Sequence, residues 1–374
     1  MKPSQFKKLI LVSCLNACLF SACMKGGDPS SGGSSGTSGT TGTTGTTGTT
    51  GTTGTTGTTG TTGNTGNTNP PPAVTASYTV SLFAGSQSTA MDGTGSAAGF
   101  KTPRGLAMDA SGNLYVADPI VNEVRKVTTP GAVVTTIATS TSFTNTIGSV
   151  AVDVSGNAYF LGSTIYKITP AGVVTPLSVG VGNLTAIAAD AAGNIFFSTN
   201  SAVYKYSSTG NTTIIAGNTS QQGNADGTGT AATFFSIGAM TVDPAGNNIY
   251  VADIKGGTSI IRKITTTAVV TSITLSPAIT PATNANYSGP PFVGIAVDGS
   301  GNIYTTETGG NLILEISPSG AVSTLAGTGA TPPNNGPASS AGFYLPWGIV
   351  VNSAGTIIYV ADAENKTIRK IVKN

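Results

Sequence analysis

The chain has 374 residues, of which 51 are glycine and only 9% are charged, against about 25% charged residues in an average soluble domain. Histidine is absent and the formal net charge is +2, which excludes a Ser-His-Asp triad, a histidine-ligated zinc and an imidazole base. The few lysines and arginines also exclude the broad basic surface that nucleic-acid binding requires.

Residues 1–22 are typical of an export signal. Three lysines near the start precede a mostly apolar stretch, residues 9–22, which is shorter than the roughly 20 residues that a membrane-spanning helix needs. The stretch ends in Phe20-Ser21-Ala22-Cys23, which resembles the lipobox of bacterial lipoproteins and implies diacylation of Cys23. Two alternatives stay open, namely the weaker match Leu15-Asn16-Ala17-Cys18 and a plain signal peptide cut elsewhere.

The cysteines and the residue after Cys23 indicate the destination. All three cysteines lie within residues 14–23, so removal of the signal leaves one, and no disulfide framework is possible. Met24 follows Cys23. An aspartate at this position resembles the inner-membrane retention signal of enterobacteria, and its absence favours the outer membrane. We therefore expect an exported, lipid-anchored protein of the cell envelope, attached to the outer membrane.

Residues 23–77 are predicted to form a lipid-anchored, disordered linker. From Gly36 to Gly66 a glycine stands at every third position, mostly as Thr-Thr-Gly, and prolines 70–72 follow. Without apolar side chains this segment cannot bury a core, and as a flexible coil it spans roughly 40 Å. The glycine period also fits a collagen-like triple helix, which would make a trimer, but the tract lacks the proline that collagen needs. We therefore expect a solvated spacer and a monomeric protein.

Residues 78–374 contain six copies of one sequence unit. The first copy runs from Gly105 to Asp118, with a Gly112-Asn113 turn between two apolar stretches. The other copies begin at Ser149, Ala186, Ala239, Gly294 and Gly348. Each unit is predicted to form four short antiparallel strands, and a four-stranded unit that recurs at this spacing is typical of a β-propeller blade.

The two ends of the repeat region predict how the ring closes. The sixth unit ends at Asn374 after its third strand, whereas Val80-Ser81-Leu82-Phe83-Ala84-Gly85 resembles the fourth strand of the fifth unit, Val322-Ser323-Thr324-Leu325-Ala326-Gly327. We therefore expect an all-β, six-bladed propeller whose last blade is closed by the N-terminal strand, which hides a sheet edge.

The repeat unit closely resembles the NHL repeat. The best match is Ala361-Asp362-Ala363-Glu364-Asn365-Lys366-Thr367-Ile368-Arg369-Lys370-Ile371, and the resemblance covers all six units. The second and third units depart from it, because Tyr166 and Tyr204 replace the arginine. The resemblance implies a six-bladed propeller and says little about activity.

Long connections on one face of the predicted ring are where we expect binding. Residues 85–104, 217–238 and 327–347 are related insertions, whose phenylalanines should pin them onto the ring, and residues 276–292 form a different long loop. Arg104 and Trp347 precede the innermost strand of their blades, near the mouth of the central channel, and both residue types are common in binding hot spots. The candidate ligand-binding residues are Arg104, Trp347, Tyr344, Glu307, Phe235 and Phe292.

The repeated aspartates are predicted to be structural. One set ends the first strand of a unit and should cap the following turn; its members are Asp109, Asp153, Asp190, Asp243 and Asp298. A second set should brace the next loop; its members are Asp118, Asp253 and Asp362.

The function we expect is non-catalytic binding of a protein or glycan through the loop face, with no cofactor and no nucleic acid. The alternative is a propeller enzyme of the lactonase or lyase type. The streptogramin lyase-like and amidating-lyase-like relatives use histidines, whereas a lactonase-like site needs several Asp, Glu or Asn side chains around a calcium ion at the channel mouth. A third possibility is that the ring only displays or spaces something.

Overall fold

The computed structural model describes residues 72–73, 76–86, 89–139, 148–279 and 287–374. The chain divides into two units, Met1–Gly63 and Asn64–Asn374, and the first lies wholly outside the described residues. The predicted signal peptide, Cys23 and most of the predicted spacer therefore also lie outside them. In the described part, no helix is long and apolar enough to cross a lipid bilayer.

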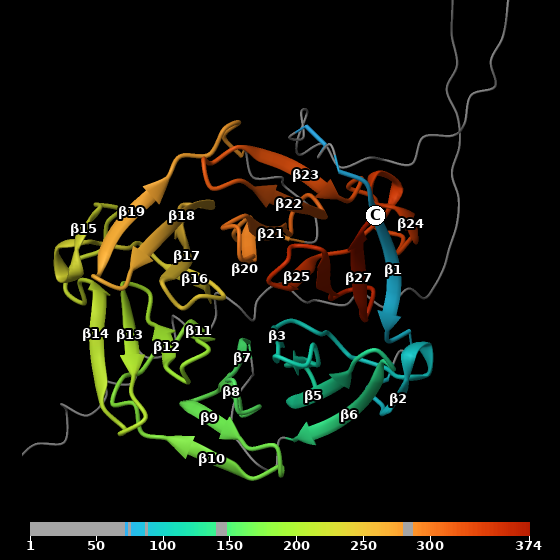
Figure 1. The fold of residues 1–374 in the computed structure, drawn as a ribbon, viewed down its shortest axis with the longest axis horizontal. Helices are drawn as coiled ribbons and strands as arrows, with labels where there is room; N and C mark the ends of the chain where they lie inside the picture. Colours follow the sequence, from blue (N-terminus) through green and yellow to red (C-terminus); the bar gives the residue numbers. More distant parts are fainter. Residues whose placement is uncertain (1–71, 74–75, 87–88, 140–147, 280–286) are drawn as a thin grey trace, which may run out of the picture. The chain divides into compact units, whose positions relative to one another are not determined.

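Six antiparallel sheets surround a common axis in the second unit (Figure 1), which confirms the predicted six-bladed, all-β propeller. The four main strands of each blade, from the axis outwards, are as follows. They are β3 (Leu106–Met108), β4 (Leu114–Asp118), β5 (Glu123–Thr128) and β6 (Val133–Ala138) in blade 1; β7 (Val150–Val152), β8 (Ala158–Leu161), β9 (Ile165–Ile168) and β10 (Val174–Leu177) in blade 2; β11 (Ala186–Ala189), β12 (Ile195–Ser198), β13 (Ala202–Tyr206) and β14 (Thr212–Gly217) in blade 3; β16 (Ile237–Val242), β17 (Asn248–Lys255), β18 (Thr258–Thr265) and β19 (Val269–Ile273) in blade 4; β20 (Phe292–Val297), β21 (Ile303–Glu307), β22 (Leu312–Ile316) and β23 (Val322–Ala326) in blade 5; and β25 (Pro346–Val351), β26 (Ile357–Asp362), β27 (Thr367–Lys373) and β1 (Tyr78–Ala84) in blade 6.

The N-terminal strand β1 completes blade 6, as predicted. It runs antiparallel to β27, with Val80 opposite Ile371, and Figure 1 shows it on the outer side of that strand. Val80 is fully buried in the same apolar cluster as Ile371. The ring is therefore closed both by a backbone ladder and by core contacts between the two ends of the repeat region.

Contacts of the ring begin slightly before Tyr78, the predicted start of the propeller. The backbone N–H of Thr324 on β23 donates to the carbonyl of Pro72 at 2.8 Å, and that of Asn374 donates to the carbonyl of Ser77 at 2.9 Å. The described residues just before β1 thus contact β23, the outer strand of blade 5, and Asn374, which follows β27 of blade 6.

The related insertions each add a short fifth strand that the sequence pattern did not predict. These strands are β2 (Gly93–Thr94), β15 (Gly227–Thr228) and β24 (Gly336–Pro337), and each is followed by a single 3₁₀ turn. They pair with β6, β19 and β1, the outer strands of blades 1, 4 and 6. Each insertion therefore runs out to the rim of the following blade and returns inwards to its innermost strand.

An aspartate stabilises the turn between the first and second strands of a blade, on the face opposite the long insertions. The Asp298 carboxylate accepts hydrogen bonds from the backbone N–H groups of Ser300 and Asn302, both at 2.9 Å, and from the Asn302 amide. Gly301 supplies the left-handed backbone at φ 84° that closes the turn. The same arrangement recurs at Asp109, Asp153 and Asp190, and a closely similar one at Asp243. These aspartates are turn caps, as predicted.

Candidate functional site

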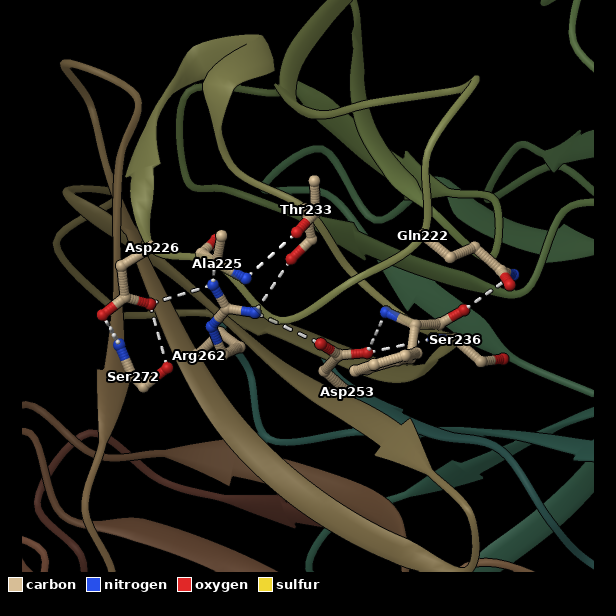
Figure 2. A network of polar contacts seen from close by, with 9 residues as sticks. Gln222, Ala225, Asp226, Thr233, Ser236, Asp253, Arg262 and Ser272 are labelled. Carbon is tan, nitrogen blue, oxygen red and sulfur yellow. Dashed lines mark hydrogen bonds and ion pairs between the residues drawn. The ribbon is translucent and has the colours of Figure 1, made fainter.

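A buried arginine holds each of the three related insertions in place. Arg262 on β18 is fully buried. Its Nη1 donates to the carbonyl of Thr233 at 3.1 Å, and its Nη2 donates to the carbonyl of Ala225 and the carboxylate of Asp226, both at 2.9 Å (Figure 2). Asp226 also accepts from the backbone and hydroxyl of Ser272 on β19. The guanidinium thus ties both limbs of the insertion to the blade beneath.

Arg125 and Arg369 do the same in blades 1 and 6. Arg125 donates to the carbonyl of Gly99 at 3.1 Å and to Asp92 at 2.7 Å. Arg369 donates to the carbonyls of Gly342 at 2.9 Å and Asn334 at 2.7 Å. Each guanidinium also lies 5.0–5.5 Å from the ring of a fully buried phenylalanine of its insertion; these are Phe100, Phe234 and Phe343. The phenylalanines pack the insertions onto the ring, as predicted, and the arginines add hydrogen bonds and ion pairs to the same attachment.

A buried aspartate completes each attachment. The Asp253 carboxylate accepts from the backbone N–H groups of Phe235 at 2.8 Å and Ser236 at 3.0 Å (Figure 2), and it lies 3.2 Å from Arg262. Burial raises the pKa of Asp253 against the effect of these hydrogen bonds. Burial likewise raises the pKa of Asp362, in this case to about 6. The loop-bracing role predicted for this second set of aspartates is therefore observed.

The arginines of this attachment were missed by sequence reasoning, although a signal existed. Arginine stands on the third strand only in the three blades that follow a related insertion, whereas tyrosine stands there in blades 2 and 3 and leucine in blade 5. The runs that contain it, such as Val124-Arg125-Lys126-Val127, predict only a strand. Half of the hydrogen bonds that the three arginines donate go to loop carbonyls, which have no residue-type signature.

Arg104 and Trp347 meet where blades 6 and 1 adjoin. The guanidinium carbon of Arg104 lies 4.2 Å from the centroid of the Trp347 ring, and the backbone N–H of Gly348 donates to the carbonyl of Arg104 at 2.8 Å. Tyr287 stands edge-on to the indole, with ring centroids 6.5 Å apart. Since Arg104 precedes β3 and Trp347 lies at the start of β25, this cluster lies at the loop-face end of the innermost strands.

The guanidinium of Arg104 has no carboxylate partner among the described residues. The ion pairs there involve Arg125, Arg262 and Arg369 instead, and the buried Nε of Arg104 has no hydrogen-bond acceptor within the same residues. Burial lowers the pKa of Arg104, while the charges of Glu364, Tyr287 and Asp118 oppose that shift. Arginine keeps its charge even so, so this cluster presents a cation that is stacked on Trp347 and forms no ion pair with the described residues.

The remaining candidates lie in different environments. Tyr344 is partly buried, and its backbone N–H donates to Asp362 at 2.7 Å. Phe235 is also partly buried, with the Lys255 ammonium 4.8 Å from its ring centroid. Tyr344 and Phe235 both lie on related insertions, at the loop face where binding is expected.

Phe292 and Glu307 lie in the interior, opposite each other on β20 and β21. Phe292 is 1% exposed and belongs to an apolar cluster, and Glu307 is 2% exposed and accepts from the backbone N–H of Gly310 at 2.7 Å. Because neither side chain reaches the surface, the expectation that they contact a ligand does not fit their placement. Because Phe292 and Glu307 are directly opposite each other in the β20–β21 pair, their side chains lie on the same face of the sheet, and both are buried there.

The innermost strands line a central cavity of about 190 Å³. Its wall is mostly aliphatic, with Met108, Ile187 and Val351 among the lining residues, and it includes no Asp, Glu or Asn. In the portion of the chain that the structure describes, no group of three or more His, Cys, Asp or Glu could hold a metal ion. The lining residues therefore do not fit the calcium site of the alternative prediction.

Comparison with known proteins supports the fold. No family model and no curated protein matches the sequence. Among solved structures, a protein of unknown function from Bacteroides thetaiotaomicron is 22% identical, with a TM-score of 0.62 over 79% of this chain and 76% of that chain. An auxiliary nutrient binding protein from the same organism is 18% identical, with a TM-score of 0.59 over 79% and 76%. A streptogramin B lyase is 16% identical, with a TM-score of 0.52 over 80% and 98%.

Proposed function

We propose that the protein is an exported, lipid-anchored binding module that holds a protein or glycan ligand on the loop face of its propeller. In this proposal Cys23 is the anchor, and the chain between Cys23 and the first ring contact, at Pro72, is the spacer. The observation that supports binding is the Arg104 guanidinium, which is stacked on Trp347 without a carboxylate partner in the described part of the chain.

The chemistry of this cluster indicates an anionic group on the ligand. A partly buried cation without an opposite charge beside it is costly, and a carboxylate, sulfate or phosphate would supply that charge. Hydrogen bonds of this charge-assisted kind are roughly twice as strong as neutral ones. Trp347 and Tyr287 would provide the apolar contact area beside the ionic group.

The buried arginines support the same function by fixing the loops in advance. Trp347 ends the insertion that Arg369 holds, and Arg104 ends the insertion that Arg125 holds. A surface ordered before binding loses less conformational entropy when the ligand arrives. Two structural neighbours, from Bacteroides thetaiotaomicron and Bacteroides ovatus, are described as auxiliary nutrient binding proteins, which is consistent with ligand binding.

The test is binding of the full chain, purified in detergent, to an array of anionic glycans, neutral glycans and acidic peptides. At least one anionic probe should bind, and Arg104→Gln or Trp347→Ala should abolish that signal. Lys101→Gln is the matched control, because Lys101 is an exposed cation on the same insertion. Absence of anionic binding, or its retention in Arg104→Gln, contradicts the proposal.

A further inference from the structure

A separate pocket of about 370 Å³ opens over blade 3. Its walls come from three connections on the loop face: Gly182–Asn183 between β10 and β11, Thr199–Ser201 between β12 and β13, and Thr219–Gln222 after β14. Tyr204 on β13 completes the lining. The volume falls within the range of small-molecule sites, about 300–1,000 Å³.

The pocket is present because blade 3 lacks the attachment described above. Tyr204 lies opposite Phe197 on the neighbouring strand, at the register position where blades 1, 4 and 6 place Arg125, Arg262 and Arg369. Thr199 likewise stands where they place the buried aspartate. The connection from blade 2 to blade 3, residues 178–185, is also short. With neither an ion pair nor an overlying insertion, the space stays open.

The lining carries hydrogen-bonding groups but no formal charge. It contains the amides of two asparagines and two glutamines and the hydroxyls of serine, threonine and tyrosine, and it includes no Asp, Glu, Lys or Arg. The side chains of Asn183 and Gln221 are exposed, and neither hydrogen-bonds to another residue that the structure describes. Their donors and acceptors therefore remain available to a ligand.

Tyr204 gives the pocket an aromatic element. Tyr204 is 8% exposed, and its ring stacks on that of the fully buried Phe197, with centroids 5.2 Å apart and an interplanar angle of 8°. Its hydroxyl makes no hydrogen bond to another described residue. Since the stack fixes the ring, the hydroxyl is held at a defined position in the pocket wall.

We infer that this pocket binds a neutral saccharide. Sugar hydroxyls donate and accept hydrogen bonds, as do the amides and hydroxyls of the lining. An anionic ligand would find no cation there and a cationic ligand no carboxylate, while an apolar peptide side chain would meet a single ring. The inference uses residues separate from Arg104 and Trp347, and so it extends the proposed function without depending on it.

The test is titration of the full chain in detergent with neutral tetrasaccharides of glucose, xylose, mannose and N-acetylglucosamine. At least one should bind, and Asn183→Gly combined with Gln221→Ala should weaken its affinity about tenfold, the effect of losing one or two hydrogen bonds. Glycine suits position 183, because Asn183 has a φ of 56°. Tyr204→Phe, which keeps the stack, should weaken binding by a smaller factor.

The matched control is Tyr166→Phe in blade 2, where tyrosine stacks on Phe160 at 5.3 Å in the same way. It should leave tetrasaccharide binding unchanged. The inference is overturned if none of the four tetrasaccharides binds, if the Asn183 and Gln221 variant binds as tightly as wild type, or if these residues are needed only for peptide binding. Because the anionic probes report on Arg104, failure here is distinguishable from failure of the proposed function.

Discussion

The guanidinium of Arg369 lies 3.2 Å from the carboxylate of Asp362, and both side chains are fully buried. The pair joins β27 to β26 within blade 6. Arg369 also donates to Gly342, and Asp362 accepts from the backbone of Tyr344, so the pair also fixes the insertion that leads to Trp347. Stability of the last blade and order at the channel mouth therefore depend on the same two residues.

Arg369→Ala should lower the free energy of unfolding by about 3–5 kcal/mol, because it leaves the Asp362 carboxylate buried without its cation. Urea denaturation of the full chain would measure the loss. Lys370→Ala, on the adjacent and less buried position of β27, is the control and should change stability by only about 0.5 kcal/mol. Equal effects of the two substitutions would show that the buried pair has no special role.

The stability of the folded protein should carry a pH dependence from Asp362. Burial raises the pKa of this carboxyl from 3.8 to about 6, so the folded chain holds the proton more tightly than the unfolded chain does. The contribution of Asp362 is therefore fully present below about pH 4 and is lost as the pH rises towards 6.

Denaturation of wild type and Asp362→Asn across this range isolates the effect. The free energy of unfolding of wild type minus that of the variant should fall between about pH 4 and pH 6 and then level off. A difference that stays constant, or rises with pH, would mean that the pKa of Asp362 is not raised in the folded state.

Gly348→Ala should disturb the mouth cluster. A β-carbon at position 348 would collide with the backbone carbonyl of Arg104, which now accepts a hydrogen bond from Gly348. We expect a loss of stability of about 1–3 kcal/mol, typical of overpacking, together with weaker anionic binding. Gly148→Ala is the control, since no atom lies within 4 Å of its added β-carbon. If both substitutions are neutral in denaturation, the close contact at Gly348 is not a constraint.

Features that depend on local or repeated patterns could be predicted from the sequence. The pairing of Val80 with β27 followed from a missing strand at one end and a surplus strand at the other. The turn formed by Asp298 followed from an aspartate and a Gly-Asn pair at fixed spacing. Burial of Phe100 followed from its recurrence in three related insertions.

Features that depend on contacts between distant segments could not be predicted in the same way. Arg262 is buried because carbonyls of a separate insertion surround it, and carbonyl positions leave no trace in composition. Glu307 was predicted as a candidate ligand-binding residue, yet its side chain is buried in blade 5. The pocket beside Tyr204 exists because no long insertion covers blade 3. The sequence shows that the insertion is missing, but only the folded ring shows that the neighbouring loops leave the space open.

Lipid attachment at Cys23 is a separate prediction, outside the described residues. Cells that express the full chain and are fed an alkyne-labelled palmitate should incorporate the label into wild type, and Cys23→Ala should eliminate it. Cys18→Ala is the control for the competing lipobox match and should leave labelling intact. If Cys18→Ala and not Cys23→Ala eliminates the label, the lipid is attached to Cys18. If wild type incorporates no label, the result favours a plain signal peptide.

Trp347 is the only tryptophan of the chain, so its fluorescence reports on the mouth cluster alone. Titration of the full chain with an anionic array ligand should change the emission in a saturable way, and Arg104→Gln should abolish the change while Lys101→Gln preserves it. Emission that stays constant while the ligand binds would contradict a binding site at Arg104 and Trp347.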